Sequence, residues 1–520
     1  MELANIDIAV FVIYVIGLII LAAWVSREKA GHTKNTEDYF LASKSLPWWA
    51  IGASLIAANI SAEQIIGMSG SGYLIGLGIA SYEWMAALTL VIVGKYMLPI
   101  FLKQKIYTMP QYLEQRYNHS VRMVMATFWI ALYVFVNLTS ILWLGALAIN
   151  TVTGIDMTYG MIFLGVFALS YSLYGGLKAV AFTDIIQVVL LIFGGLFLSY
   201  LTLDIIGNGE GFWRGAMILT EQFPEKFDMI LSEDNKYYKD LPGISVLIGG
   251  MWVMNFSYWG FNQYIIQRAL AAESLEEAQK GINFAAFLKL LMPIIVVLPG
   301  IAAIMLAPDL EKPDQAYPTM MNLMPVGLKG LIFAALVAAI VSSLSSMINS
   351  ISTIFTMDIY SHYRADKSQS HYVAVGRSIS VIALLIAMVC AQPLLASFDQ
   401  GFKFIQDFTG FFTPGIVVIF ILGLFWSRAT ANGAIVAAIS SFILSCGFYY
   451  FKPDLPFIDR VGLVFVICLV LAIIISLFGK QESHSQAVNI KDVDFSTSRS
   501  FNIQSIIIIL ILIALYTTWW

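Results

Sequence analysis

The sequence predicts an all-α membrane protein that crosses the bilayer about fourteen times. Hydrophobic residues make up 59% of the 520 residues, and charged residues only 12%, about half of the ~25% usual in soluble domains. A soluble fold has too much surface in contact with water to hide so many apolar side chains. Apolar runs of the ~20 residues needed to cross a membrane recur along the whole chain.

The apolar runs divide the chain in order. The first lacks the basic start of a signal peptide, so we expect it to be retained as a leading helix with a loop, residues 1–46. We expect a first half over 47–206, a loop over 207–242, a second half over 243–426 and three trailing helices over 427–520. The runs are 5–26, 47–72, 77–102, 122–149, 157–174, 182–206, 243–269, 281–307, 327–360, 373–397, 401–426, 431–451, 456–478 and 500–520.

Two of these runs carry polar residues at membrane depth, which is typical of interrupted helices. The second run holds Asn59, Glu63 and Gln64, followed by a cluster of glycines, and the seventh holds the polar and aromatic stretch 255–263. Packing of neighbouring helices alone would explain one such segment. The two segments lie five runs apart, and an odd number of spans reverses the direction of the chain through the membrane. They therefore indicate two inverted five-helix repeats, with a binding site where the broken helices meet.

The ninth run supplies a third polar element. Its small residues over 334–346 allow a close helix contact, and the adjacent hydroxyls of Ser342 and Ser343 suit a hard monovalent cation. Carbonyl groups freed at a helix break would complete such a site. Serines in membrane helices more often bond back to their own backbone. Glu83, Asp184, Lys289 and Asp407 are further buried ionisable candidates.

The distribution of basic residues predicts the orientation. Most of the 29 lysines and arginines fall in or beside the loop after the first run and every second loop thereafter. Because cytoplasmic loops carry such an excess, we expect these loops inside and both termini outside the cell. Net charge is only −4 and no basic block occurs, so the sequence indicates no nucleic-acid partner.

The sequence resembles the sodium/solute symporters, in the branch of sodium/glucose and sodium/galactose cotransporters, and most closely its bacterial galactose-transporting members. The resemblance runs nearly end to end. It is carried by SLPWWAIGASLIAANISAEQ (45–64), SYEWMAALTL (81–90), YSLYGGLKAVAFTDIIQ (171–187), YWGFNQYIIQR (258–268), AAFLKL (285–290), AALVAAIVSSLSSM (334–347) and FIQDFTG (404–410).

This resemblance implies a fold, a function and a site. The fold is a LeuT-like core of two inverted five-helix repeats with one leading and three trailing helices. The function is sodium-driven uptake of a hexose (galactose or glucose). The protein would lie in the bacterial inner membrane and need no obligatory protein partner. Sodium would bind the carbonyls of Ala57, Ile60 and Ala339 and the hydroxyls of Ser342 and Ser343, with Asp184 on its exit path. Hexose would bind Asn59, Gln64, Glu83, Asn255, Lys289 and Gln406, with Tyr258 stacked on the ring; Tyr258, Trp259, Tyr82, Phe402 and Asn137 would form the gates.

The chemistry of these residues suits a sugar. Hydroxyl groups need both donors and acceptors: Glu83 accepts, Lys289 donates, and the amides do both. One position departs from the galactose pattern, because Ala86 stands where that pattern has a serine. The sequence therefore leaves the choice between galactose, glucose and another hexose open.

Three other functions are compatible with a membrane protein of this kind. The same machinery can carry another small solute, such as proline, sialic acid, pantothenate or iodide, but the hydroxyl-seeking side chains favour a sugar. A membrane sugar sensor would need an output domain, and the loops are too short for one. A primary pump or membrane enzyme would need a nucleotide domain, and the sequence has no Gly-x-x-x-x-Gly-Lys-Ser/Thr loop.

Overall fold

A computed structural model describes residues 3–25, 45–106, 108–396, 398, 400–479 and 490–520, without the side chains of 22–23 and 171–180. The expected inside loop that follows the first run therefore lies largely outside the described residues. The first part of the chain forms α1 (Asn5–Val25), α3 (Trp48–Asn59), η2 (Glu63–Gly67), α4 (Met68–Leu74), η3 (Leu77–Ala80), α5 (Ser81–Ile92), η4 (Val93–Met97), α6 (Leu98–Gln104), α7 (Met109–Arg116), α8 (His119–Leu132), η5 (Tyr133–Leu138), α9 (Thr139–Thr153) and α10 (Met157–Ile206).

The remaining helices follow with short connections. They are α11 (Phe212–Gln222), η6 (Pro224–Lys226), α12 (Ser245–Ile248), α13 (Gly250–Phe256), η7 (Ser257–Phe261), α14 (Gln263–Leu270), α15 (Leu275–Met292), η8 (Pro293–Val297), α16 (Leu298–Leu306), η9 (Pro313–Gln315), α17 (Ala316–Met321), α18 (Leu328–Thr353), η10 (Ile354–Tyr360), α19 (Ser361–Tyr363), α20 (Gln369–Leu395), α21 (Gly401–Thr409), α22 (Thr413–Phe425), α23 (Ala431–Phe451), α24 (Phe457–Phe478), η11 (Ile490–Asp492) and α25 (Arg499–Thr518).

The all-helical prediction is confirmed, since the described residues contain no strand. Nine helices of the described chain are long and apolar enough to cross a membrane, and eleven when two bent pairs each count as one span. The fifth and sixth expected runs differ from the prediction, because both lie in the single helix α10, with no loop between them. The count of fourteen spans therefore stays a prediction.

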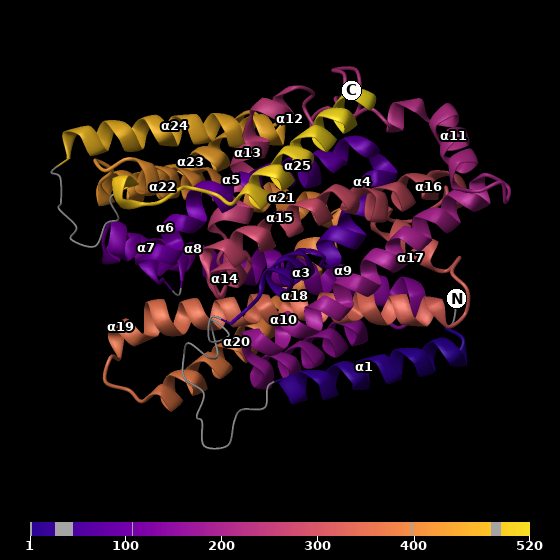
Figure 1. Cartoon of the computed structure of the whole chain (residues 1–520), viewed down its shortest axis with the longest axis horizontal. Coiled ribbons are helices and arrows are strands. Elements are labelled where there is room, and N and C mark those ends of the chain that lie inside the picture. Colours follow the sequence, from indigo (N-terminus) through magenta and orange to yellow (C-terminus); the bar gives the residue numbers. More distant parts are fainter. Residues whose placement is uncertain (1–2, 26–44, 107, 397, 399, 480–489) are drawn as a thin grey trace.

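Most of the long helices run side by side in one bundle (Figure 1). The N-terminus and α11 lie toward the right of this view, and α7 and α19 toward the left. α10 packs along α18, α3 and α9, and α3 also packs on α15. The trailing helices α22, α23 and α24 contact one another. The polar segments 59–64 and 255–263 are thereby brought into the interior of the bundle.

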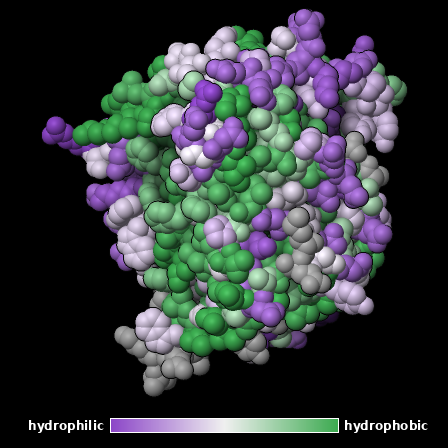
Figure 2. Space-filling model, turned by 90° about the vertical axis from the view of Figure 1, so that its right-hand side faces the viewer, coloured by the Kyte–Doolittle hydropathy of each residue, from purple (hydrophilic) through white to green (hydrophobic). Residues whose placement is uncertain are grey.

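The outer surface of the bundle is apolar over wide areas. Large hydrophobic side chains such as Ile13, Val389 and Phe478 are exposed, and hydrophobic residues cover much of the face seen in Figure 2, with hydrophilic ones gathered toward its upper right. A soluble monomer does not expose apolar surface on this scale. Lipid is the environment that such a surface requires.

The two interruptions predicted from polar residues are confirmed. α3 and the helix that continues through η2 and α4 meet at an angle of 61° around residues 60–62. In the seventh run the helix widens into η7 and then breaks at Asn262, whose backbone is extended. A further break was not predicted: α21 and α22 meet at 48°, in a run whose only signals are Gly410 and Pro414.

The leading helix α1 is fixed to the bundle through one carboxylate. Asp7 is completely buried, and its Oδ1 accepts hydrogen bonds from the amides of Gly327 (2.7 Å) and Gly330 (2.9 Å). These amides belong to the first turn of α18, whose own residues provide no side-chain cap. A side chain from another helix thus caps the helix that carries Ser342 and Ser343.

We expect Asp7→Ala to lower the stability of the protein by about 1–2 kcal/mol, because the first turn of α18 loses its cap. Asp7→Asn is the matched control, since an amide oxygen can accept the same two bonds. Thermal unfolding in detergent checks this. Equal unfolding temperatures for the alanine and asparagine variants would show that the cap contributes nothing.

Candidate functional site

The break after α3 releases backbone carbonyl groups inside the bundle. In an unbroken helix the amide of Ser61 would donate to the carbonyl of Ala57, but it donates to Asn59 instead (2.7 Å). The amide of Gln64 likewise donates to Ser61 (3.1 Å) rather than to Ile60. The carbonyls of Ala57 and Ile60, both predicted cation ligands, therefore lose their helical donors at the break.

The helix α18 lies against this break. Ser343 Oγ donates to the carbonyl oxygen of Ala58 (3.3 Å), at the end of α3. The hydroxyl of Ser342 donates to Asp184 in α10. The structure thus brings the serines, the break and Asp184 together, and it places Ala339, also in α18, one turn before Ser343.

A guanidinium group that the sequence analysis did not assign completes this cluster. Arg268 of α14 is buried, its Nε donates to Ser54 Oγ (2.8 Å) and its Nη2 lies 3.8 Å from Asp184 Oδ2. Ser54 Oγ in turn donates to Asp184 (2.7 Å). The only sequence signal for this residue was a basic side chain at the end of an apolar run.

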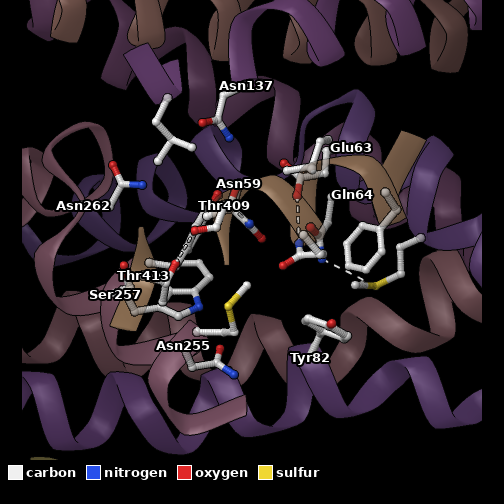
Figure 3. A pocket seen from close by; sticks show the side chains of 18 of the residues that line it. Asn59, Glu63, Gln64, Tyr82, Asn137, Asn255, Ser257, Asn262, Thr409 and Thr413 are labelled. Atoms are coloured by element: carbon white, nitrogen blue, oxygen red, sulfur yellow. Dashed lines mark hydrogen bonds between the residues drawn. The ribbon is translucent and has the colours of Figure 1, made fainter. Parts of the chain in front are cut away.

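A cavity lies beside the same break. Most of its walls come from the broken helices α3–η2 and α13–η7, from α5, from α8 and η5, and from α21 and α22. In Figure 3, Glu63, Gln64 and Tyr82 lie on one side of the cavity and Asn255 and Ser257 on another. Of the predicted residues, the lining contains Asn59, Gln64, Tyr82, Glu83, Asn137, Asn255, Tyr258, Trp259, Phe402 and Gln406.

A chain of polar contacts crosses the buried side of this cavity. Gln64 Nε2 donates to Glu83 Oε1, and Glu83 Oε2 accepts from Lys289 Nζ (2.5 Å). Lys289 also donates to Asn59 Oδ1. These four side chains come from α3, η2, α5 and α15, and the ion pair holds two charges that burial would otherwise make very costly.

Lys289 differs from the other predicted residues in its position. Its side chain is fully buried, is paired with Glu83, and lies 4.8 Å from the ring of Trp259. It is not among the described residues that line the cavity. Its contact with a substrate stays a prediction, and its observed position is behind Glu83 and Asn59.

Aromatic side chains border the cavity. Tyr258 accepts a hydrogen bond from Asn59 Nδ2 (3.0 Å) and contacts the hydroxyl of Tyr264, and its ring lies 5.0 Å from that of Trp259. Toward another side, the rings of Tyr82 and Phe402 meet edge to face at 5.1 Å. The structure therefore groups the predicted gate residues into two aromatic pairs on different helices.

Glu63 belongs to the cavity wall, although its sequence pattern predicted no role for it in the site. Its carboxylate lines the cavity, is 93% buried and accepts from Gln406 Nε2 (3.2 Å). A carboxylate within an apolar run, next to Gln64, was the signal that pointed to it. Thr409 and Thr413 also line the cavity, one on each side of the bend between α21 and α22.

A second buried carboxylate holds the helix α21 in place. Asp314 Oδ2 accepts from the amide of Gly401 (2.8 Å), the first residue of α21. Asp314 Oδ1 has no hydrogen-bond partner and packs so closely on α4 that a Cβ at Gly70 would lie 2.6 Å from it. Burial raises the pKa of Asp314 to about 7.

Comparison with known proteins places the chain among transporters. The model of the sodium:solute symporter family matches residues 39–440. A sodium/glucose cotransporter of Vibrio parahaemolyticus is 50% identical over 100% of this chain and 99% of its own. A rabbit sodium/myo-inositol cotransporter 2 is 32% identical over 86% of this chain and 71% of its own.

Solved structures show the same architecture. The substrate-bound, outward-open structure of a sodium-coupled sialic acid symporter is 25% identical, with a TM-score of 0.78 over 92% of this chain and 100% of the other. The inward-facing structure of Mhp1 shares the fold at 12% identity, with a TM-score of 0.54 over 90% of this chain and 99% of the other. These likenesses confirm the predicted LeuT-like fold class.

Removal of one partner of the Glu83–Lys289 pair should destabilise the protein more than removal of both. We expect Lys289→Met to cost about 3–5 kcal/mol because it leaves Glu83 buried and uncompensated. The double variant Glu83→Gln/Lys289→Met should regain part of this loss. Unfolding temperatures of the two single variants and the double variant measure the coupling, and strictly additive effects would contradict it.

Asp314 should make stability depend on pH. Its folded pKa of about 7 lies above the ordinary 3.8, so the folded state binds an extra proton between these values. Stability should therefore fall as pH rises through this window and be greatest below it. We expect the difference in unfolding temperature between pH 5 and pH 8 to shrink in Asp314→Asn and to persist in Asp309→Asn, an exposed control in the same loop.

Proposed function

The chain belongs to the sodium:solute symporter family, and we propose that it couples inward sodium flow to the uptake of a hexose by alternating access. The identity of 50% with a sodium/glucose cotransporter over the whole chain supports a sugar as the substrate. The sodium gradient and the membrane potential would supply the energy, at ~2.3 kcal/mol per charge per 100 mV. The protein is a transporter rather than an enzyme.

One observation carries this proposal: the break in α3 belongs to both candidate sites. On one side the carbonyl of Ala58, next to the freed carbonyl of Ala57, accepts from Ser343 of α18. On the other, Asn59, Glu63 and Gln64 line the cavity. A cation that braces the break against α18 would thereby position the cavity wall. This shared segment gives coupling between ion and sugar a physical basis.

The proposed sodium ligands are the carbonyls of Ala57, Ile60 and Ala339 and the hydroxyls of Ser342 and Ser343. Neutral oxygen ligands without an exchangeable proton favour sodium over a proton. Ser342 bonds to Asp184, so that carboxylate is the first anionic group that a departing cation would meet. One such site corresponds to one sodium ion per sugar.

The proposed sugar site combines hydrogen-bonding side chains with an aromatic face. The hydroxyls would be contacted by polar side chains, namely Asn59, Gln64, Glu83, Asn255, Lys289 and Gln406. Tyr258 would stack on the ring as the inner gate. Glu63 adds an acceptor beside Gln406. Tyr82 and Phe402 would close the outer side, because their rings already touch.

We further propose that both termini lie outside the cytoplasm of a bacterial inner membrane. The excess of lysine and arginine in alternate loops supports this orientation. Figure 1 agrees with it, since both marked chain ends lie to the right of α7 and α19.

Uptake into liposomes tests the function. We expect labelled glucose or galactose to accumulate with an inward sodium gradient and not with a potassium or proton gradient. Competition between the two sugars identifies the preferred one. Sodium-driven uptake of another solute, with no uptake of either hexose, would keep the coupling but reject the sugar.

Ser343→Ala tests the sodium site in the same assay. Loss of one oxygen ligand should raise the sodium concentration for half-maximal uptake about tenfold or more. Ser350→Ala is the matched control, because the Ser350 hydroxyl bonds back to Ser346 within the same helix (3.0 Å). Unchanged sodium activation in Ser343→Ala would remove this residue from the site.

A further inference from the structure

A cleft of about 650 Å³ lies between the leading helix α1 and the rest of the bundle. Its walls come from α1, α9, α10 and α18, and it shares no lining residue with the central cavity. α1 packs on α10 and α18, and α9 packs on the same two helices. We call it the α1 cleft; its apolar walls include Ile8, Phe11, Phe163, Phe333 and Val337.

The lining of the α1 cleft is almost entirely apolar. Among the described lining residues, only Asn5, Thr153 and Tyr159 carry a polar side chain. The hydroxyl of Thr153 already donates to the carbonyl of Ile149 (2.6 Å). A bound water needs two to four polar partners, so the apolar part of the cleft is unsuited to water and suited to hydrocarbon.

The cleft opens on the lipid-facing surface and leads into the bundle. Ile8, Ile155 and Phe163 are exposed, whereas Phe333 and Val337 are only 3% and 1% exposed. α1 runs along the lower edge of the bundle in Figure 1, so the exposed residues belong to the surface that lipid surrounds. The cleft therefore continues the lipid environment inward, as far as α18.

The depth of the cleft corresponds to one leaflet. The cleft is lined by the beginnings of α1, α10 and α18 and by the end of α9, which meet on one side of the bundle. Val337 lies about 14 Å along α18 from its first residue, Leu328, at 1.5 Å per residue. Half of a ~30 Å hydrocarbon core is about 15 Å, which is the depth that one lipid chain occupies.

Size and charge define the occupant. A helix of a partner protein, ~10 Å across and ~14 Å long, would fill roughly 1,100 Å³, which is more than the cleft holds. A single flexible chain belongs to the range of ligands that sites of ~300–1,000 Å³ accept. Asp156 is exposed next to Ile155 at the mouth, and its carboxylate favours a headgroup that carries an ammonium group.

We propose that the α1 cleft binds one acyl chain of a zwitterionic phospholipid. The chain packs on Phe163, Phe333 and Val337, and the headgroup lies at the mouth beside Asp156. The lipid thereby fills the space between α1 and α18, the helix whose first turn Asp7 caps. The site depends on the membrane environment and not on the proposed transport of a hexose; only its assignment to the outer leaflet uses the proposed orientation.

Photocrosslinking of the full-length protein in lipid nanodiscs tests the site. The probe is a phosphatidylethanolamine with a diazirine on one acyl chain, and peptide mass spectrometry locates the crosslinks. We expect crosslinks at Phe333 and Val337, because lipids that only surround the bundle do not reach side chains so deeply buried. Crosslinks confined to exposed residues such as Val389 would overturn the proposal.

Two variants fill the cleft from different walls. Ile8→Trp and Ile155→Trp should each lower crosslinking at Phe333 and Val337 about tenfold, because the chain loses its packing contacts. They should equally lower the phospholipid that native mass spectrometry finds on the purified protein. Ile13→Trp is the matched control, since Ile13 is 70% exposed on the same helix and does not line the cleft. It should change neither measurement.

Three further outcomes would overturn the lipid site. Crosslinks at Phe333 and Val337 that survive both filling variants would show that the chain arrives by another route. Stronger crosslinking by the matching phosphatidylglycerol probe would reject the zwitterionic headgroup. A dimer in native mass spectra that excludes the probe from the cleft would make a second copy of the chain its occupant.

Discussion

The structure depends on one constraint: backbone groups inside a membrane must find partners without help from water. Over the described residues the chain meets it mostly with continuous helices and, besides the bend between α21 and α22, departs from it at two polar segments. At residues 60–62 the carbonyls of Ala57 and Ile60 lose their helical donors, and at Asn262 the backbone becomes extended. Both segments face polar side chains of other helices, and both candidate sites lie there. The candidate binding sites thus lie where the regular helical hydrogen bonding is interrupted.

The same absence of water explains how the buried charges are arranged. Glu83 is matched by Lys289, and Asp184 by Arg268 and two serine hydroxyls. Every one of these contacts joins helices that are far apart in the sequence, because a buried charge must be compensated wherever the partner comes from. Each network also borders a candidate site. A shift of one helix would uncover a charge unless a sugar or a cation replaced the lost contact, which links ligand binding to helix position.

Tyr82 of α5 and Phe402 and Gln406 of α21 line two neighbouring cavities. α21 is short, begins at an amide held by Asp314 and ends at a sharp bend. Tyr258 and Trp259 provide the corresponding aromatic pair on the opposite broken helix.

The sequence alone determined the membrane environment, the helical class and the two interrupted helices, because apolar runs and polar residues within them are local signals. Those signals, together with the family resemblance, gave about half of the cavity lining. The sequence missed the bend between α21 and α22, whose signals were one glycine and one proline. It also left Glu63 and Arg268 without roles. Only the tertiary structure decided these two points, since Glu63 bonds to Gln406 and Arg268 approaches Asp184. It also shows Lys289 paired with Glu83, whereas a contact of Lys289 with the substrate stays a prediction. The physical reason is that a local pattern shows which groups need partners, whereas the packing of distant helices decides which partners they find.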